Sequence, residues 1–393
     1  MLALGYNAAL VATGAGLLGV AAGVTGSFLF LRKRALVSDA MSHATLPGLA
    51  LAFMVMTVLG GDGRALPGLL AGSALSAWLG VLTVSWLSRR TRLGEDAAIG
   101  AVLSVFFGLG IVGLTVIQSL NTGRQAGLET FLLGSTAGML FSDALTIALG
   151  GALTLALAWL LRRPMLMVAF DPDYATATGR DVARIDLAML ALALAVTVVG
   201  LKIVGLILIV ALLIIPPVAA RFWSDRADRV VLLSGIIGGG AGVTGALLSG
   251  MAPDLPTGPI IVLIAFGLFA VGFFFSPGRG VLAAVLRHRR FQRRVHMRQG
   301  LLAIAQGQPV YERLTLRLLR RAGLIRADAV ATDAGRAVAA KALLDEHRWQ
   351  ILRADPRFET AAALYDGLRP LDTVLTPDQL TEIDRNLRPE AAT

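Results

Sequence analysis

Long apolar segments alternate with short polar ones along the chain as far as residue 276. A helix needs about 20 consecutive apolar residues to cross the hydrocarbon core of a membrane. Segments long enough occur at 7–31, 38–60, 67–87, 97–120, 128–161, 184–222, 230–250 and 258–276. The segment 184–222 is too long for one span and contains Lys202, so we divide it into two, whereas 128–161 has room for a short re-entrant piece before its span. The pattern predicts an all-α polytopic membrane protein with about nine transmembrane helices.

The basic residues between the apolar segments predict how the chain is oriented, because Lys and Arg gather in the cytoplasmic loops of membrane proteins. The connections expected in the cytoplasm are Arg32-Lys33-Arg34, Arg89-Arg90-Thr91-Arg92, Arg162-Arg163 and 221–229. The connections expected outside are 61–66, 121–126 and 251–257, which are poorer in basic residues. The N-terminus is then external and the C-terminus cytoplasmic. The first segment has no basic n-region and no evident cleavage site, so we expect it to be retained as a helix.

Composition divides the chain into an apolar part and a charged part. Hydrophobic residues make up 55% of the 393 residues, yet residues 287–393 hold 19 of the 36 Lys and Arg residues and 13 of the 26 Asp and Glu residues. We therefore expect a transmembrane domain over 1–286, a basic juxtamembrane linker over 287–298 and a cytoplasmic domain over 299–393. Cysteine is absent, so any metal site must use His, carboxylates, carbonyls, Met or water.

Asp39 and His43 are the first candidates for chemistry. They lie four residues apart at the start of an apolar helix, which puts both side chains on one face. A carboxylate and an imidazole together suit Mn²⁺, Zn²⁺ or Fe²⁺, and ionisable residues inside a membrane usually face a cavity. Pro47 has no N–H, so the carbonyl of His43 loses its helical donor, as expected near a transport site. In the structural alternative, Asp39 caps the helix and His43 hydrogen-bonds inside the bundle.

A polar insertion over 169–180 separates two apolar segments. Asp171-Pro172 predicts the start of a short helix and Gly179 its end. Such a helix, parallel to the membrane surface, would let a membrane protein dock on a soluble motor, although an ordinary loop helix fits the pattern equally well. The chain has no G-x-x-x-x-G-K-[ST] phosphate loop, so ATP hydrolysis would belong to a separate subunit.

Four stretches together resemble the ABC-3 permeases of manganese, zinc and iron importers. They are 36–53 (LVSDAMSHATLPGLALAF), 94–107 (GEDAAIGAVLSVFF), 202–221 (KIVGLILIVALLIIPPVAAR) and 244–262 (TGALLSGMAPDLPTGPIIV). Phe131-Leu132-Leu133-Gly134 and the 170–186 loop extend the resemblance, which covers residues from about 15 to 277.

The resemblance implies the type II ABC importer permease fold and a transport subunit that is not itself an enzyme. It implies as partners an ABC ATPase subunit, an extracytoplasmic metal-binding protein and a second permease, either a second copy or a homologue. Asp39 and His43 match the family residues that line the translocation path, whereas Asp171, Ala175 and Gly179 match the loop that couples to the ATPase. The metal ion is then cargo, with no cofactor bound permanently, and the location is the cytoplasmic (inner) membrane.

The charged tail resembles, over about 300–355, the winged-helix domain of iron-dependent repressors. The sequence 314–325 predicts an amphipathic helix, a Gly cap and a strand, another helix starts near 332, and Glu346-His347-Arg348-Trp349 follows. Residues 301–323 have room for about two helices where the repressor family has three, and 299–393 carries 13 basic and 13 acidic residues. These departures argue against DNA binding and favour a degenerate winged-helix-like contact or regulatory module. The six arginines of 287–298 are expected to lie near anionic membrane lipid.

Other transport classes remain open at this point. A type II permease for a metal chelate such as a siderophore or cobalamin would have the same bundle but would not need Asp39 and His43. A secondary transporter driven by an ion gradient would not need a motor-docking loop. A membrane-tethered transcription regulator is poorly supported by the neutral tail. The sequence does not choose among Mn²⁺, Zn²⁺ and Fe²⁺, because all three accept the same donors.

Overall fold

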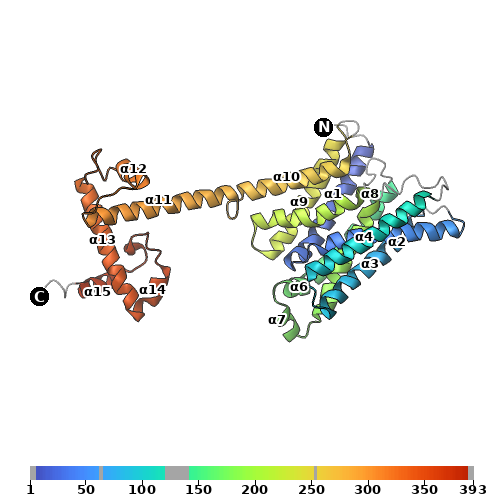
Figure 1. Ribbon diagram of the computed structural model, residues 1–393, viewed down its shortest axis with the longest axis horizontal. Coiled ribbons are helices and arrows are strands. Elements are labelled where there is room, and N and C mark those ends of the chain that lie inside the picture. The colour runs from blue at the N-terminus through green and yellow to red at the C-terminus, as the bar shows by residue number, and fades with distance from the viewer. Residues whose placement is uncertain (1–5, 62–64, 120–140, 252–254, 388–393) are drawn as a thin grey trace. The chain divides into compact units, whose positions relative to one another are not determined.

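The protein is described by a computed structural model over residues 6–61, 65–119, 141–251 and 255–387 (Figure 1). The regular structure in these ranges is helical, apart from an isolated β-bridge between Ile325 and Ala331. The chain divides into two compact units, Met1–Val281 and Leu282–Thr393. The predicted all-α polytopic class is confirmed. The re-entrant piece expected near 128–140 and the Phe131–Gly134 motif lie outside the described residues.

The first unit is a bundle of long apolar helices. Among its described residues, eight segments are long and apolar enough to cross a membrane, and a shorter apolar segment covers Leu208–Trp223. The helices are α1 (Tyr6–Leu31), α2 (Val37–Val58), α3 (Leu66–Arg90), α4 (Glu95–Ser119), α6 (Phe141–Phe170), the short α7 (Pro172–Ala177), α8 (Val182–Trp223), α9 (Ala227–Ser249) and α10 (Thr257–Phe275).

The long helix α8 is interrupted within its length, as the sequence predicts, but at a different residue. Gly205 has φ of 78° and ψ of 169°, so the segments Val182–Leu201 and Leu208–Trp223 meet at a non-helical residue. We expected the division at Lys202, because a charge interrupts the apolar run there. The break falls at Gly205 because glycine, which has no Cβ, adopts positive φ at little cost.

Helix α6 extends further than its apolar run. It continues through Arg162 and Arg163 to Phe170, past the predicted end at residue 161. The guanidinium of Arg162 lies over the Trp159 ring, 3.5 Å from the ring centroid. An apolar stem and an aromatic partner let a basic residue remain in a helix at the edge of a membrane.

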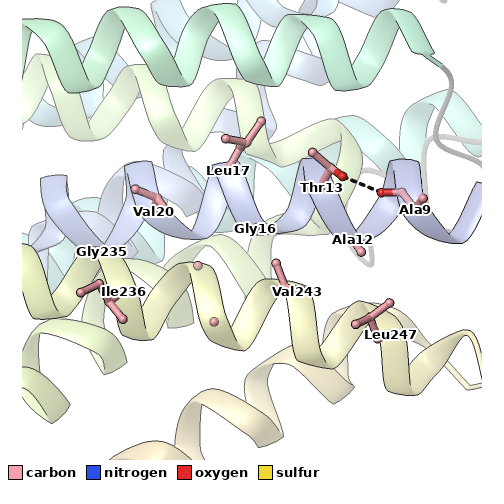
Figure 2. A pocket seen from close by; sticks show the side chains of 12 residues that line it. Ala9, Ala12, Thr13, Gly16, Leu17, Val20, Gly235, Ile236, Val243 and Leu247 are labelled. Carbon is pink, nitrogen blue, oxygen red and sulfur yellow. Dashed lines mark hydrogen bonds between the residues drawn. The ribbon is translucent and has the colours of Figure 1, made fainter. Parts of the chain in front are cut away.

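Helix α1 lies at the centre of the bundle, where it packs against α6, α8 and α9. A Cβ atom added at Gly19 would overlap the carbonyl oxygen of Gly238, so the α1 and α9 backbones are in direct contact there. Small residues allow this approach, and close packing replaces the hydrophobic effect as the force between helices in lipid. Beside the contact, Leu17, Val20 and Ile236 are among the apolar walls of a cavity of about 510 Å³ (Figure 2).

The second unit begins with α11 (Val281–Ala305), followed by α12 (Arg313–Arg321) and α13 (Asp333–Ala354). Two short 3₁₀ turns, Pro356–Phe358 and Leu371–Thr373, and helices α14 (Glu359–Leu364) and α15 (Pro377–Leu387) complete it. Residues 287–298, which the sequence predicts as a linker, are helical and form the middle of α11. Leu301, Leu319 and Ala339 share one apolar core, whereas Leu352 and Phe358 belong to another. The winged-helix resemblance of this unit stays a prediction.

The contact between α1 and α9 generates a stability prediction. Gly19→Ala should lower the unfolding free energy by about 1–3 kcal/mol, because the new methyl group meets rigid backbone rather than a movable side chain. Thermal unfolding of the purified protein in detergent measures the effect. Gly240→Ala on α9 is the matched control, since a Cβ there meets no atom within 4 Å. Equal stability of the two variants would contradict direct backbone contact.

Candidate functional site

The predicted pair lies in the first two turns of α2. Asp39 is in the first turn, and the Nε2 atom of His43, one turn further on, lies 3.4 Å from Asp39 Oδ1. No side chain caps this helix, whose N-cap residue is Leu36, so Asp39 does not have the capping role of the structural alternative. The i, i+4 spacing therefore brings the carboxylate and the imidazole together as the sequence predicts.

His43 is held in an apolar setting with one polar atom left without a partner. Its ring makes an edge contact with Phe107 of α4, with centroids 5.0 Å apart. Its Nδ1 atom is buried and has no hydrogen-bond partner among the described residues. A buried imidazole nitrogen without a partner is energetically unfavourable, so the site has an unused donor or acceptor.

The pair is accessible but incomplete. The side chains of His43 and Asp39 are 22% and 37% exposed, so both can reach a ligand. Within the described part of the chain, no group of three or more His, Cys, Asp or Glu residues could hold a metal ion. Since Pro47 lacks an N–H, the carbonyl of His43 is a further oxygen without its usual helical donor.

A buried ion cluster lies at the same end of the bundle, and sequence reasoning missed it. Arg32 donates to both carboxylate oxygens of Asp186, at 2.9 and 3.2 Å, and Arg34 donates to the same carboxylate at 3.2 Å. Arg34 also pairs with Glu95 at 2.9 Å. Only 6% of the Asp186 side chain is exposed. The cluster joins the α1–α2 connection to the starts of α4 and α8.

The sequence contains a signal for this cluster. Arg32 and Arg34 fit the positive-inside pattern, which by itself gives them no partner. Asp186 is the single acidic residue of the apolar segment 184–222, and an acid in such a segment needs a partner. Which basic residue supplies that partner is a matter of tertiary structure, since Arg32 and Asp186 are 154 residues apart.

The polar insertion forms the short helix that the sequence predicts. Asp171 is the N-cap residue of α7, and its side chain accepts a hydrogen bond of 2.8 Å from the Tyr174 amide. Gly179 follows the helix with φ of 78°, the left-handed conformation of a helix C-terminus. A Cβ at Gly179 would meet no atom within 4 Å. The backbone conformation therefore requires glycine there, whereas contacts within the chain do not.

Ala175 anchors α7 to the bundle. It is fully buried and belongs to the apolar core that also contains Val37, Ala40 and Met41 of α2. The residues around Asp39 and the short helix α7 therefore share one packed core. A packed core transmits displacement from one element to another because it is dense and nearly incompressible.

Comparison with known proteins identifies what this bundle is similar to. The model of the ABC 3 transport family matches residues 6–276. The manganese transport system membrane protein MntC of Bacillus subtilis is 40% identical over 298 residues, which cover 76% of this chain and 67% of that protein. The zinc transport system membrane protein TroC of Treponema pallidum is 36% identical over 285 residues, which cover 72% of this chain and 94% of that protein.

Solved structures show the same fold. A chain of PsaBC from Streptococcus pneumoniae in complex with Fab matches with a TM-score of 0.59 and 30% identity, over 70% of this chain and 93% of that chain. An inward-facing putative metal-chelate type ABC transporter matches with a TM-score of 0.52 over 66% of this chain and 83% of that chain. Its identity is 17%, so it supports the fold alone.

The buried ion cluster generates a second stability prediction. Asp186→Asn should destabilise the protein by about 3–5 kcal/mol, because two guanidinium groups lose their buried carboxylate. Asp181→Asn is the control: its pair with Arg184 is exposed, so the loss should stay below about 1 kcal/mol. Asn also keeps the N-cap at this position. Thermal unfolding of both variants measures the difference, and an equally small effect at the two positions would contradict the structural role of Asp186.

Proposed function

The chain belongs to the ABC-3 transport family, and we propose that it is the permease subunit of an ATP-driven importer of Mn²⁺ or Zn²⁺. The manganese and zinc transport proteins that it resembles support this cargo. Fe²⁺ accepts the same donors, so it is a further candidate cargo. The chain is a multi-pass membrane protein, and its role is transport rather than catalysis.

The observation that carries the proposal is the pairing of Asp39 with His43, whose Nδ1 atom is buried without a partner. Carboxylate oxygen and imidazole nitrogen are donors that first-row divalent ions accept. A transport site must bind its ion but also release it, so two side-chain donors from one chain suit a transient site better than a closed structural site. A permease for a siderophore or cobalamin would have no need of this pair.

A second permease supplies the remaining ligands in this proposal. A two-fold axis would present Asp39 and His43 twice, from a second copy or from a homologous subunit. The carbonyl of His43 adds an oxygen that Pro47 leaves without a helical donor. Four side-chain donors would then surround an ion at the interface of the two subunits.

The short helix α7 is the proposed contact with the ABC ATPase. It presents Tyr174 and Asp173 to the surface, while Ala175 holds it to the bundle core. A secondary transporter would not need such an element. In this assignment the C-terminus is cytoplasmic, and a metal-binding protein delivers the ion from the opposite side of the membrane.

Uptake by a strain that lacks its own manganese and zinc importers tests the function. Co-expression of the chain with its ATPase and metal-binding protein should restore uptake of radioactive manganese or zinc. Asp39→Asn and His43→Ala should each reduce uptake at least about tenfold while leaving expression and thermal stability near the unaltered protein, because both side chains are partly exposed and their 3.4 Å contact contributes little to stability.

Asp96→Asn is the matched control for charge removal, because Asp96 lies exposed in the first turn of α4. It should leave uptake unchanged. Uptake that survives in either site variant would remove Asp39 and His43 from the path. Low yield with normal uptake per molecule would assign them a structural role.

Gly179 offers a separate test of the ATPase contact. Gly179→Val should weaken co-purification of the ATPase and uptake together, because a β-branched residue is strained at φ of 78°. Gly179→Asn should retain most of both, since Asn tolerates the left-handed region. Loss in both variants would show instead that the ATPase backbone approaches this residue closely. Full co-purification and transport with Val would rule out the contact.

A further inference from the structure

The second unit contains a cavity that metal transport does not explain. Its volume is about 620 Å³, within the range of roughly 300–1,000 Å³ usual for small-molecule sites. Its walls come from α11, α12, α13 and the segment before the second 3₁₀ turn. All of the lining residues belong to Leu282–Thr393, so the cavity is a property of this unit alone.

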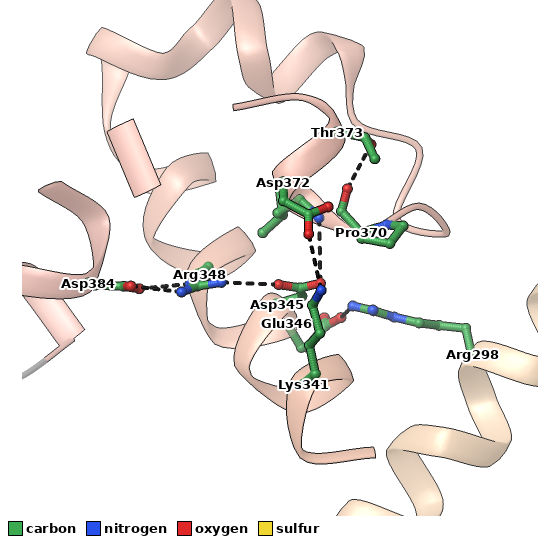
Figure 3. Close-up of polar contacts among 10 residues, drawn as sticks. Arg298, Lys341, Asp345, Glu346, Arg348, Pro370, Asp372, Thr373 and Asp384 are labelled. Atoms are coloured by element: carbon green, nitrogen blue, oxygen red, sulfur yellow. Dashed lines mark hydrogen bonds and ion pairs between the residues drawn. The ribbon is translucent and has the colours of Figure 1, made fainter. Parts of the chain in front are cut away.

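Positive side chains dominate the polar part of the lining. Arg293, Arg294, Arg298 and Lys341 all line the cavity, and Asp345 is the one carboxylate among the lining residues. Asp345 is already engaged, because it accepts from Arg348 at 3.4 Å and from the Leu371 amide at 3.4 Å (Figure 3). These contacts hold Asp345 in place, and its single negative charge offsets only part of the positive charge of the lining.

The cationic groups are only partly matched by other carboxylates. Arg298 donates to Glu346 at 3.1 Å and Lys341 to Asp372 at 3.0 Å (Figure 3). Arg293, exposed on α11, has no hydrogen bond or ion pair with any described residue. Arg294 interacts electrostatically with Asp366, so its charge is partly matched. An anion bound beside Arg293 and Arg294 would still reduce the repulsion between these adjacent arginines.

One of the cationic residues in the lining has a buried polar atom without a partner. The Nε–H of Arg298 is buried and donates to no described atom. Buried donors without acceptors are uncommon in folded proteins, and a ligand oxygen in the cavity would satisfy this one.

The rest of the lining is apolar. Met297 and Leu301 of α11, Leu318 of α12 and Val338 of α13 form it together with Leu368. A free phosphate ion would fill little of this volume and would bury none of the apolar wall against an apolar group. The lining is suited to a molecule that joins a phosphate group to an apolar body.

We propose that this cavity, the α11–α13 cavity, binds a phosphate-bearing amphipathic ligand through Arg293, Arg294 and Arg298. Guanidinium groups form paired, charge-assisted hydrogen bonds with phosphate, and the Met297–Leu301 side of the cavity covers the apolar body. The ligand comes either from an anionic lipid headgroup or from a soluble phosphate ester. Residues 276–280 alone separate α10 from α11, so this unit follows a membrane-spanning helix directly in the chain. The proposal does not depend on which metal is transported.

Hydrogen exchange of the full-length chain in nanodiscs tests the site. In one arm the bilayer contains phosphatidylcholine with increasing phosphatidylglycerol. In the other, adenosine diphosphate is added to phosphatidylcholine nanodiscs as the soluble probe. We expect slower exchange of amides in 293–301, 338–345 and 365–370 in at least one arm. Protection with phosphatidylglycerol identifies a headgroup ligand, and protection with adenosine diphosphate identifies a soluble one.

Two double variants of α11 distinguish binding in the cavity from general electrostatic attraction to the helix. Arg293→Gln with Arg294→Gln should raise the probe content needed for protection at least about tenfold, the effect of losing charge-assisted hydrogen bonds. Arg289→Gln with Arg290→Gln removes the same charge from exposed positions of α11 outside the cavity. In the adenosine diphosphate arm it should change the required probe content less than about twofold, and with phosphatidylglycerol it should change it less than the cavity pair does. Val338→Trp keeps every charge, fills the cavity and should also weaken protection.

The proposal has two clear ways to fail. Equal weakening by the two double-arginine variants would show attraction to the helix as a whole rather than a site. Absence of protection in both arms would show that the cavity does not take a phosphate-bearing ligand. Exchange in the second apolar core, around Leu352 and Phe358, reports whether a variant has unfolded the unit.

Discussion

The direct backbone contact between α1 and α9 is the constraint on which the rest of the bundle depends. Gly19 and Gly238 leave no room for side chains between the two helices, so α1 is fixed in position along its middle. Because α1 also packs against α6 and α8, the position of its C-terminal end is fixed within the bundle. There Arg32 meets Asp186 of α8, and the connection that follows sets the start of α2, where Asp39 and His43 lie.

Asp186 and the Asp39–His43 pair differ in how their polar atoms are satisfied. Asp186 is buried with its carboxylate oxygens accepting from two arginines, as a charge removed from water must be. The Asp39–His43 pair is partly exposed, its two side chains are 3.4 Å apart, and its His43 Nδ1 atom is buried without a partner among the described residues. The first kind of arrangement holds helices together. The second leaves capacity for a ligand, which is why we assign it to the ion.

In the proposed assignment of α7 as the ATPase contact, packing alone would connect the ATPase to the Asp39–His43 pair. Ala175 of α7 and Ala40 and Met41 of α2 belong to one apolar core, and Asp186 lies one turn into the helix that follows α7. A shift of α7 would therefore act on both the core and the ion cluster, which lie at the start of α2. The second unit has a different character, since its cavity gathers arginines whose charge the unit itself does not fully compensate.

Local sequence patterns are enough to predict the class of the protein, the succession of apolar segments, the proximity of Asp39 and His43, and the short helix α7 with its Asp171 cap and Gly179 end. The apolar segments follow from the free energy of transferring about 20 residues into a membrane, and the Asp39–His43 contact follows from the helical repeat. The ends of α7 follow from local capping preferences. All of these effects act between residues that are close in the chain. Even here the sequence predicts the break in α8 at the charged Lys202, whereas it occurs at Gly205, where glycine adopts positive φ at little cost. Only the tertiary structure decided that Arg32 and Arg34 meet Asp186, that His43 Nδ1 is left without a partner, and that α11, α12 and α13 enclose a cationic cavity. Those features join residues distant in sequence, and their energies depend on packing that no local pattern encodes.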